Sequence, residues 1–156
     1  MHCNAKKGNI LSVCSSTNPL IKFYEIDGNI LEQVESAKYH GATIHESLEF
    51  SDHVRETVSK ANKRLGFLKW NLKGCPVNMT KLAYISLVHS GLEYGAAVWD
   101  PHLGTHKKAT ERVQNQAIRW PVGYGARQMC SITNLWKELK LQTLEERRRQ
   151  LRLSFL

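Results

Sequence analysis

Acidic side chains that could hold metal ions for phosphodiester chemistry are few and scattered in this sequence. Such chemistry usually needs two or more closely placed carboxylates. The only aspartates are Asp27, Asp52 and Asp100, and none of them is next to another acidic residue. The adjacent pair Glu145 and Glu146 falls in the first turn of an expected helix, where carboxylates interact favourably with the helix dipole. A structural role is therefore favoured for this pair.

Histidine, cysteine and serine residues also lack a catalytic context. His102 and His106 are four residues apart, a spacing that can place two imidazoles on one helical face for a metal. Gly104 lies between them and no third ligand is evident, so the metal interpretation is disfavoured. The sequence has no Cys-x-x-Cys pair and no Gly-x-Ser-x-Gly motif. We expect reduced thiols, no cofactor and no nucleophilic active site.

Cationic side chains are the remaining candidate site. The chain has 22 Lys+Arg against 14 Asp+Glu, a formal net charge of +8. This balance favours a polyanionic partner, because phosphates neutralised by Lys or Arg release counterions. Two expected helices carry the clusters, which are Lys60, Lys63, Arg64, Lys69 and Lys73 on one and Arg147, Arg148, Arg149 and Arg152 on the other. For any single residue a solvated helix face is an equal alternative, and only the clusters with the net charge favour phosphate contacts, with Trp70 or Trp120 nearby for stacking.

The first part of the sequence predicts strands. Short segments rich in β-branched and aromatic residues cover Asn9 to Val13, Leu20 to Ile26 and Ile30 to Val34. Asp27-Gly28 supplies the positive φ values that a tight hairpin turn demands. Lys38 to His45 continues the extended pattern, and Gly41 inside it indicates a bulge or a close approach of another backbone.

From Ser51 the pattern becomes helical. The first helix has Ser51 as its N-cap and Gly74 as its stop, and its apolar stripe is Val54, Val58, Ala61, Leu65, Leu68 and Leu72. A second helix is expected to begin at Asn78, with Leu82, Ile85, Val88 or His89, and Leu92 on its inner side. A third runs from Thr105 to Pro121 with Ala109, Val113, Ala117 and Trp120 inward. A short helix over Ser131 to Leu139 and a last one that begins with a capping box of Thr143 and Glu146 complete the set.

The expected fold class is α+β, a short N-terminal antiparallel β-hairpin region followed by a helical bundle. At 156 residues the chain is the size of one domain or two small lobes. The change from strands to helices near Ser47 divides it into residues 1–46 and 47–156. No apolar run approaches the roughly twenty residues of a membrane helix, and the N-terminus lacks a signal-peptide segment. We expect an intracellular protein, cytoplasmic or nuclear, without a membrane partner.

A succession of short motifs resembles a known family. KYHGATI (38–44), LEFSDHV (48–54) and KANKRLGFL (60–68) are similar, in this order, to segments of jockey-like, LINE-type non-LTR retrotransposon reverse transcriptases. Further matches follow in order at LAY (82–84), LEY (92–94), VWDPH (98–102), ERVQ (111–114) and LEERR (144–148). The resemblance therefore covers nearly the whole chain.

The resemblance implies a role for particular residues. Lys7 matches a palm lysine near the incoming nucleotide, and Tyr39 and Gly41 match the hairpin that grips the primer end. The helices from Ser51 onward resemble the thumb, which packs on the template-primer duplex. Residues 1–46 would then be a β-rich remnant of the palm and residues 47–156 a thumb-like region. The implied nucleic-acid-binding residues are Lys7, Tyr39, Gly41, Lys60, Lys63 and Arg64.

The resemblance also implies that this segment lacks the catalytic aspartates of the family. In the family this stretch follows the catalytic aspartates, which hold Mg in the full-length enzyme and have no counterpart here. We therefore expect a non-catalytic reverse transcriptase fragment that is not active alone and that contacts an RNA/DNA template-primer duplex, with the missing palm as a further partner. Two alternatives are a protein-interaction fragment with exposed Leu and Trp faces, and a translated retrotransposon relic with no independent function.

Overall fold

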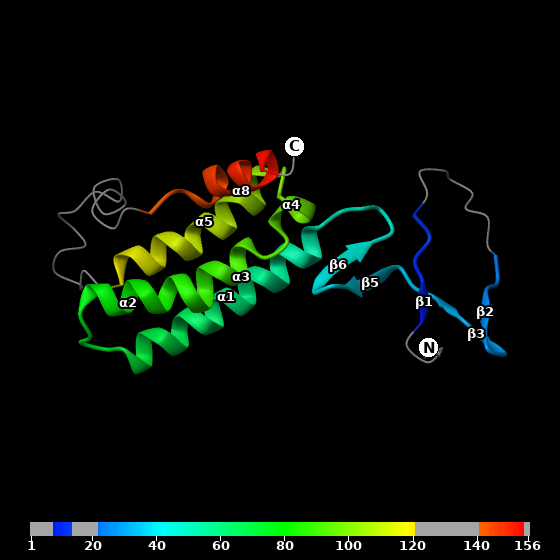
Figure 1. Cartoon of the computed structure of the whole chain (residues 1–156), viewed down its shortest axis with the longest axis horizontal. Coiled ribbons are helices and arrows are strands. Elements are labelled where there is room, and N and C mark those ends of the chain that lie inside the picture. Colours follow the sequence, from blue (N-terminus) through cyan, green and yellow to red (C-terminus); the bar gives the residue numbers. More distant parts are fainter. Residues whose placement is uncertain (1–7, 14–21, 121–140, 155–156) are drawn as a thin grey trace. The chain divides into compact units, whose positions relative to one another are not determined.

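The computed structural model describes residues 8–13, 22–120 and 141–154 of the chain (Figure 1). The chain divides into two compact units, Met1–His53 and Val54–Leu156. The first contains the strands and the second contains most of α1 and the other described helices. The expected α+β class is confirmed.

The first unit contains three separate pairs of short strands. The strands are β1 (Asn9–Ile10), β2 (Glu25–Ile26), β3 (Asn29–Ile30), β4 (Glu32–Gln33), β5 (Ser36–Tyr39) and β6 (Ala42–His45). β2 pairs with β3 and β5 pairs with β6, both antiparallel, whereas β1 pairs with β4 in parallel. The predicted antiparallel pairing therefore holds for two of these three pairs. β1 and β4 are joined by a long connection, which permits parallel pairing.

Two-residue turns close both antiparallel pairs. Asp27 and Gly28 have φ values of 49° and 75°, and His40 and Gly41 have φ values of 45° and 82°. Positive φ at both central residues matches the right-handed twist of hairpin strands. The Asp27-Gly28 turn was predicted correctly. The single strand expected over Lys38 to His45 is wrong, because the chain reverses at His40 and Gly41, and Gly41 lies in a turn rather than a bulge.

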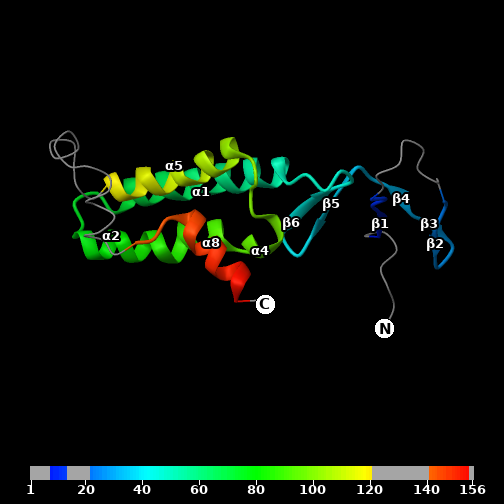
Figure 2. The same ribbon diagram turned by 90° about the horizontal axis from the view of Figure 1, so that it is seen from above.

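The described helices are α1 (Ser51–Asn71), α2 (Val77–Tyr84), the π-helical turn η2 (Ile85–His89), α3 (Ser90–Glu93), α4 (Ala96–Trp99), α5 (Gly104–Arg119) and α8 (Leu144–Leu153). α2, η2 and α3 follow one another without a break. Figures 1 and 2 show α1, this α2 to α3 segment and α5 side by side, and α8 lies against α4 and α5. The second unit is thus a small helical bundle.

One apolar core joins these helices. Its buried members are Ala61, Leu65 and Leu68 of α1, Tyr84, Val88 and Leu92 of the α2 to α3 segment, Val113 and Ala117 of α5, and Leu144 of α8. Val58, Leu72 and Trp120 pack against this core and are partly buried. The predicted apolar stripe of the first helix is therefore confirmed. Gly74, with φ of 83°, follows its end as expected.

The second helix differs from its prediction in start and register. Pro76, not Asn78, is the N-cap residue. Leu82, expected inside, is 66% exposed. The buried residues Thr80, Tyr84, Val88 and Leu92 are instead spaced by four. In a regular α-helix, which has 3.6 residues per turn, a spacing of four drifts around the axis. The wider π-helical turn η2 counters this drift and keeps these residues on the core face.

The last helix begins as its capping box predicted. The Thr143 side chain accepts a hydrogen bond from the Glu146 backbone N–H at 3.1 Å. In α5, which begins at Gly104 rather than Thr105, Val113 and Ala117 are buried as expected, together with Thr110 and Gln114. The helix predicted over Ser131 to Leu139 lies outside the described residues. None of the described helices combines the length and apolar character that crossing a membrane requires.

Candidate nucleic-acid interface

The face of α1 that points away from the core carries two lysines and two aromatic residues. Lys60, Lys63, Phe67 and Trp70 are separated by three, four and three residues, the spacing that lines one side of a helix. All four are exposed. The buried residues of α1 lie on the opposite side and hold this surface outward. We call these four residues the outer face of α1.

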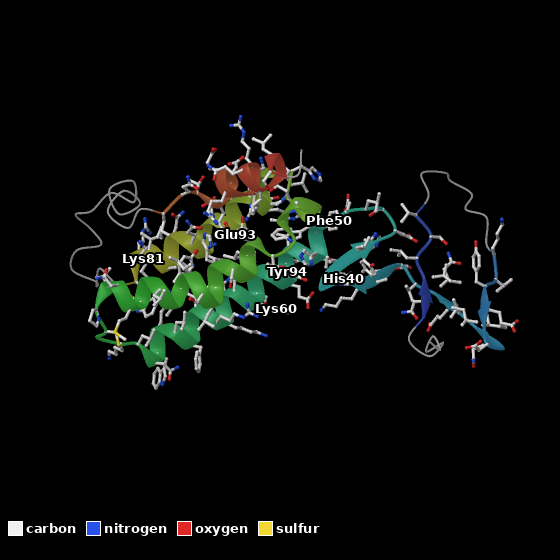
Figure 3. The ribbon with its side chains drawn as sticks, viewed as in Figure 1. His40, Phe50, Lys60, Lys81, Glu93 and Tyr94 are labelled. Atoms are coloured by element: carbon white, nitrogen blue, oxygen red, sulfur yellow. The ribbon has the colours of Figure 1, made fainter. Side chains whose placement is uncertain are left out.

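The two lysines of the outer face have different surroundings. Lys60 Nζ lies 2.7 Å from Glu56 Oε1, one helical turn away, in an exposed ion pair. Figure 3 shows the Lys60 side chain extending from α1. Exposed ion pairs of this kind contribute little to the free energy of folding, typically below about 1 kcal/mol. A phosphate can therefore compete with Glu56 for Lys60, and Lys63 is exposed on the next turn.

Arg64, the third predicted residue of this cluster, contacts the protein itself. Its Nη1 donates to the backbone carbonyl of Leu87 at 3.2 Å. Leu87 belongs to η2, where the wider turn changes the regular hydrogen-bond pattern of the helix. A Cβ added at Gly91 would lie 2.6 Å from the same Nη1. Gly91 therefore leaves room for a guanidinium that ties α1 to the π-helical turn.

Replacing Arg64 by alanine should lower the free energy of unfolding by about 1 kcal/mol, because a hydrogen bond from a charged donor is lost. Arg64→Lys keeps the charge but cannot reproduce the guanidinium geometry, so it should lose part of this stability. Denaturant unfolding followed by circular dichroism measures both changes. Lys63→Ala, an exposed substitution on the same helix, is the control and should change stability by less than about 0.5 kcal/mol.

Trp70 and Trp120, the two candidate stacking residues, differ in exposure. Trp70 is 85% exposed and Phe67, one turn earlier, is 65% exposed. Trp120 instead packs against the apolar core. Only Trp70 of this pair therefore presents its ring on the outer face beside the lysines.

Tyr39 and Gly41, two further residues predicted to bind nucleic acid, lie in the hairpin of β5 and β6. Tyr39 ends β5, is 66% exposed and meets the His40 ring edge to face at a centroid distance of 4.3 Å. Gly41 occupies the turn with a positive φ that favours glycine. His53, which lies in the family-like segment LEFSDHV, accepts a hydrogen bond from the Thr43 backbone N–H at 3.2 Å through Nδ1. Lys7 lies outside the described residues.

Three of the four arginines of α8 contact acidic or aromatic side chains of the protein, so the four do not form one exposed cationic surface. Arg147 bonds the Glu93 carboxylate, and Arg152 pairs with Asp100. Arg148 is buried beneath α8, with its guanidinium carbon 5.4 Å from the centre of the Trp99 ring. Arg149 is the exposed member of the three consecutive arginines. The second predicted cationic cluster therefore contributes mainly to helix packing.

Glu93 is the centre of the ion pairs between α3 and α8, where Figure 3 labels it. Its Oε2 lies 3.3 Å from His89 Nδ1 and accepts from Arg147 Nη2 at 3.2 Å. Burial by itself raises the pKa of Glu93, but the hydrogen bonds from His89 and Arg147 outweigh it and lower that pKa to about 2. The carboxylate is thus held ionised.

Glu111 on α5 and Asp100 are acidic neighbours of Arg148, whose Nη1 lies 4.0 Å from Asp100 Oδ1. Glu111 Oε1 accepts from the Glu145 backbone N–H at 3.0 Å, at the start of α8, where a carboxylate is favoured by the helix dipole. Burial raises the pKa of Glu111. Burial also lowers the pKa of Arg148, and the negative charges of Glu111 and Glu93 oppose this lowering. Burial, with the charges of Glu111 and Glu93, also raises the pKa of the Tyr84 hydroxyl.

No cluster of three or more His, Cys, Asp or Glu side chains within residues 8–13, 22–120 and 141–154 could hold a metal ion. Among the acidic residues considered from the sequence, Glu145 pairs with Lys107 at 2.8 Å and Asp100 pairs with Arg152. These carboxylates act as partners of basic side chains.

Comparison with curated proteins shows that the chain is a homologue of a segment of a retrotransposon reverse transcriptase, an RNA-directed DNA polymerase. The relative is the probable RNA-directed DNA polymerase from transposon BS of Drosophila melanogaster, to which the chain is 30% identical over 136 residues. The match covers 83% of this chain and 14% of the relative, so the chain spans a small part of that protein's length. No protein-family model and no solved structure matches the chain.

Proposed function

We propose that this chain carries the end of the palm, the primer-gripping hairpin and the thumb of a jockey-like, LINE-type reverse transcriptase, and that it contacts the template-primer nucleic acid. The single observation that carries the proposal is the outer face of α1. Its exposed Lys60 and Lys63 point away from a well-packed core, in a chain homologous to part of an RNA-directed DNA polymerase.

Phosphate contacts are the physical basis of this binding. Lysines on successive turns of one helix can follow a nucleic-acid backbone, and each phosphate neutralised releases counterions. Such contacts position the nucleic acid and carry little sequence information. The interface should therefore bind an RNA/DNA hybrid duplex with weak sequence preference and steep salt dependence. Tyr39 and Gly41 are proposed to act at the primer end.

Catalysis is proposed to belong to the palm of the polymerase. Asp27, Asp52 and Asp100 are far apart in the sequence, and Asp100 pairs with Arg152. The two-metal chemistry of polymerases needs carboxylates held close together. This segment would hold the nucleic acid while the palm supplies the ligands for Mg, so the chain would not polymerise alone.

A double variant, Lys60→Gln with Lys63→Gln, should bind a labelled RNA/DNA hybrid duplex about tenfold more weakly at low salt. The slope of log affinity against log salt should become shallower by nearly two, because two phosphate contacts are removed. Fluorescence anisotropy across a salt series measures both quantities. Arg64 stays unchanged, because replacing it would remove its hydrogen bond to the Leu87 carbonyl and would change stability as well as binding.

Lys108→Gln is the matched control, because Lys108 is an exposed lysine on α5. It should leave affinity near that of the unchanged chain. If the double variant and the control bind alike, with equal salt slopes, the outer face of α1 is only a solvated surface and the proposal fails.

A second candidate function, a protein interface, is favoured by the exposed apolar side chains of the helical bundle. Leu82 and Leu87 lie in α2 and η2, and Val98 lies in α4, and all three are exposed. An apolar contact persists at high salt, whereas phosphate contacts are screened. Self-association that is unchanged by salt, in sedimentation experiments, would support this second function.

A further inference from the structure

The outer face of α1 presents aromatic rings to solvent where a helix ordinarily presents polar groups. Trp70 and Phe67 are 85% and 65% exposed, and both lie on the stripe of Lys60 and Lys63. Large aromatic side chains contribute most of their free energy when covered. Two exposed rings one turn apart, next to two cations, therefore indicate a surface that is covered by a ligand.

The order of groups along this stripe is cationic and then aromatic. From Lys60 to Trp70 the helix rises about 15 Å, at 1.5 Å per residue. Lys63 lies one turn before Phe67, and Phe67 lies one turn before Trp70. The Asn71 side chain donates to the Phe67 carbonyl at 2.8 Å at the end of α1. Groups that could contact phosphates and groups that could stack on bases thus share one continuous strip.

Stacking distinguishes the two kinds of nucleic acid. Inside a duplex each base lies between its neighbours, so its flat face is not available to a ring on a helix surface. An unpaired base has a free face, and stacking on an aromatic side chain is worth about 1 to 3 kcal/mol per base. Phosphate contacts alone would need the lysines but not the rings.

We propose that the outer face of α1 binds unpaired nucleotides, RNA or DNA, with Trp70 and Phe67 stacking on bases while Lys60 and Lys63 contact phosphates. This inference rests on the proposed function and specifies the part of the nucleic acid that this site takes, the single strand that adjoins the duplex. It adds an aromatic contact to the phosphate contacts that hold a duplex.

Charge favours this occupant over a protein. Lysine is depleted at the centres of protein interfaces, where burial removes its hydration. Here two exposed lysines accompany the rings, in a chain with a net charge of +8. A strand of nucleotides complements both parts of the strip, because it offers anionic phosphates and apolar base faces together.

The test compares Trp70→Leu, Phe67→Leu and Trp70→Phe in the full chain. The probes are labelled oligothymidylate and oligouridylate of about twelve nucleotides, within the range that single-strand-binding surfaces cover, and a blunt RNA/DNA duplex of similar length. Trp70→Leu should weaken single-strand binding about tenfold, corresponding to one lost stacking contact. Phe67→Leu should act in the same direction, and Trp70→Phe should retain most of the affinity. Blunt-duplex affinity should change less than about twofold.

Leu82→Ala, which shortens an exposed apolar side chain on α2, is the matched control and should leave binding to every probe unchanged. If Trp70→Leu leaves both single-strand affinities unchanged, or weakens duplex and single strand equally, the stacking inference is overturned while phosphate binding can stand. Salt-independent self-association that Trp70→Leu abolishes would also overturn it and assign the rings to a protein contact. If the unchanged chain binds no probe at low salt, both the inference and the proposed function fail.

Discussion

Replacing Arg148 by alanine should lower the free energy of unfolding by about 3 to 5 kcal/mol, the usual cost of removing one partner from a buried ionic group. The Arg148 side chain is 1% exposed, and its guanidinium lies over the Trp99 ring. The charges of Glu111 and Glu93 act on it. The truncated side chain would leave these carboxylates without that cation and open a cavity under α8.

Two further variants separate charge from volume. Arg149→Ala changes the neighbouring exposed arginine and should alter stability by less than about 0.5 kcal/mol. Arg148→Met keeps most of the volume without the charge, so its loss should lie between those of the two alanine variants, because burying a charge is itself costly. Chemical unfolding followed by far-UV circular dichroism provides the three free energies. Equal stabilities for Arg148→Ala and Arg149→Ala would show that the buried guanidinium contributes nothing.

Sequence patterns correctly predicted the elements that depend only on residues close together in the sequence. The stripe of α1 was readable because every third or fourth residue is apolar and the helix is long enough to show it. The turn at Asp27-Gly28 and the cap at Thr143 depend on residues within a few positions. These elements were correct because each needs no information about the rest of the chain.

The register of the second helix could not be read in the same way. The prediction placed Leu82 inside by assuming 3.6 residues per turn throughout. The π-helical turn η2 inserts extra backbone per turn and brings Tyr84 and Val88 to the core face. Neither residue type signals such a turn. It is stabilised partly by Arg64, which is remote in sequence and donates to the Leu87 carbonyl.

Charged residues were the hardest part of the site to predict. Lys60, Lys63 and Arg64 look equivalent in sequence, and yet Arg64 bonds a backbone carbonyl on another helix. Likewise the run Arg147 to Arg149 resembles an exposed cationic surface, but Arg147 meets Glu93 and Arg148 is buried. The pairs of Glu56 with Lys60 and of His89 with Glu93, each four residues apart, can be recognised locally. Partners that come from distant elements leave no spacing signal.

Acid should destabilise the bundle through Glu93, by about 3 kcal/mol over its full titration. The pKa of Glu93 falls from 4.5 to about 2 on folding, so the unfolded chain binds the proton more tightly. The stabilisation is therefore complete above pH 4.5 and is lost as pH falls towards about 2. The side chains of Glu93 and His89 are 15% and 7% exposed, so solvent screens this pair weakly. Arg147 is 40% exposed and its pair is screened more, so about 3 kcal/mol is the upper limit of the loss.

Glu93→Gln tests the origin of this acid sensitivity, because the amide keeps the shape and cannot ionise. The variant should be about 3 kcal/mol less stable than the unchanged chain at neutral pH, and this difference should shrink towards zero near pH 2. Glu56→Gln, which removes only the exposed pair with Lys60, should cost less than about 1 kcal/mol. Urea unfolding at a series of pH values measures all three chains. A difference between Glu93→Gln and the unchanged chain that stays constant from neutral pH to pH 2 would show that it does not come from ionisation of Glu93, and that the charge of Glu93 does not hold α8 on the bundle.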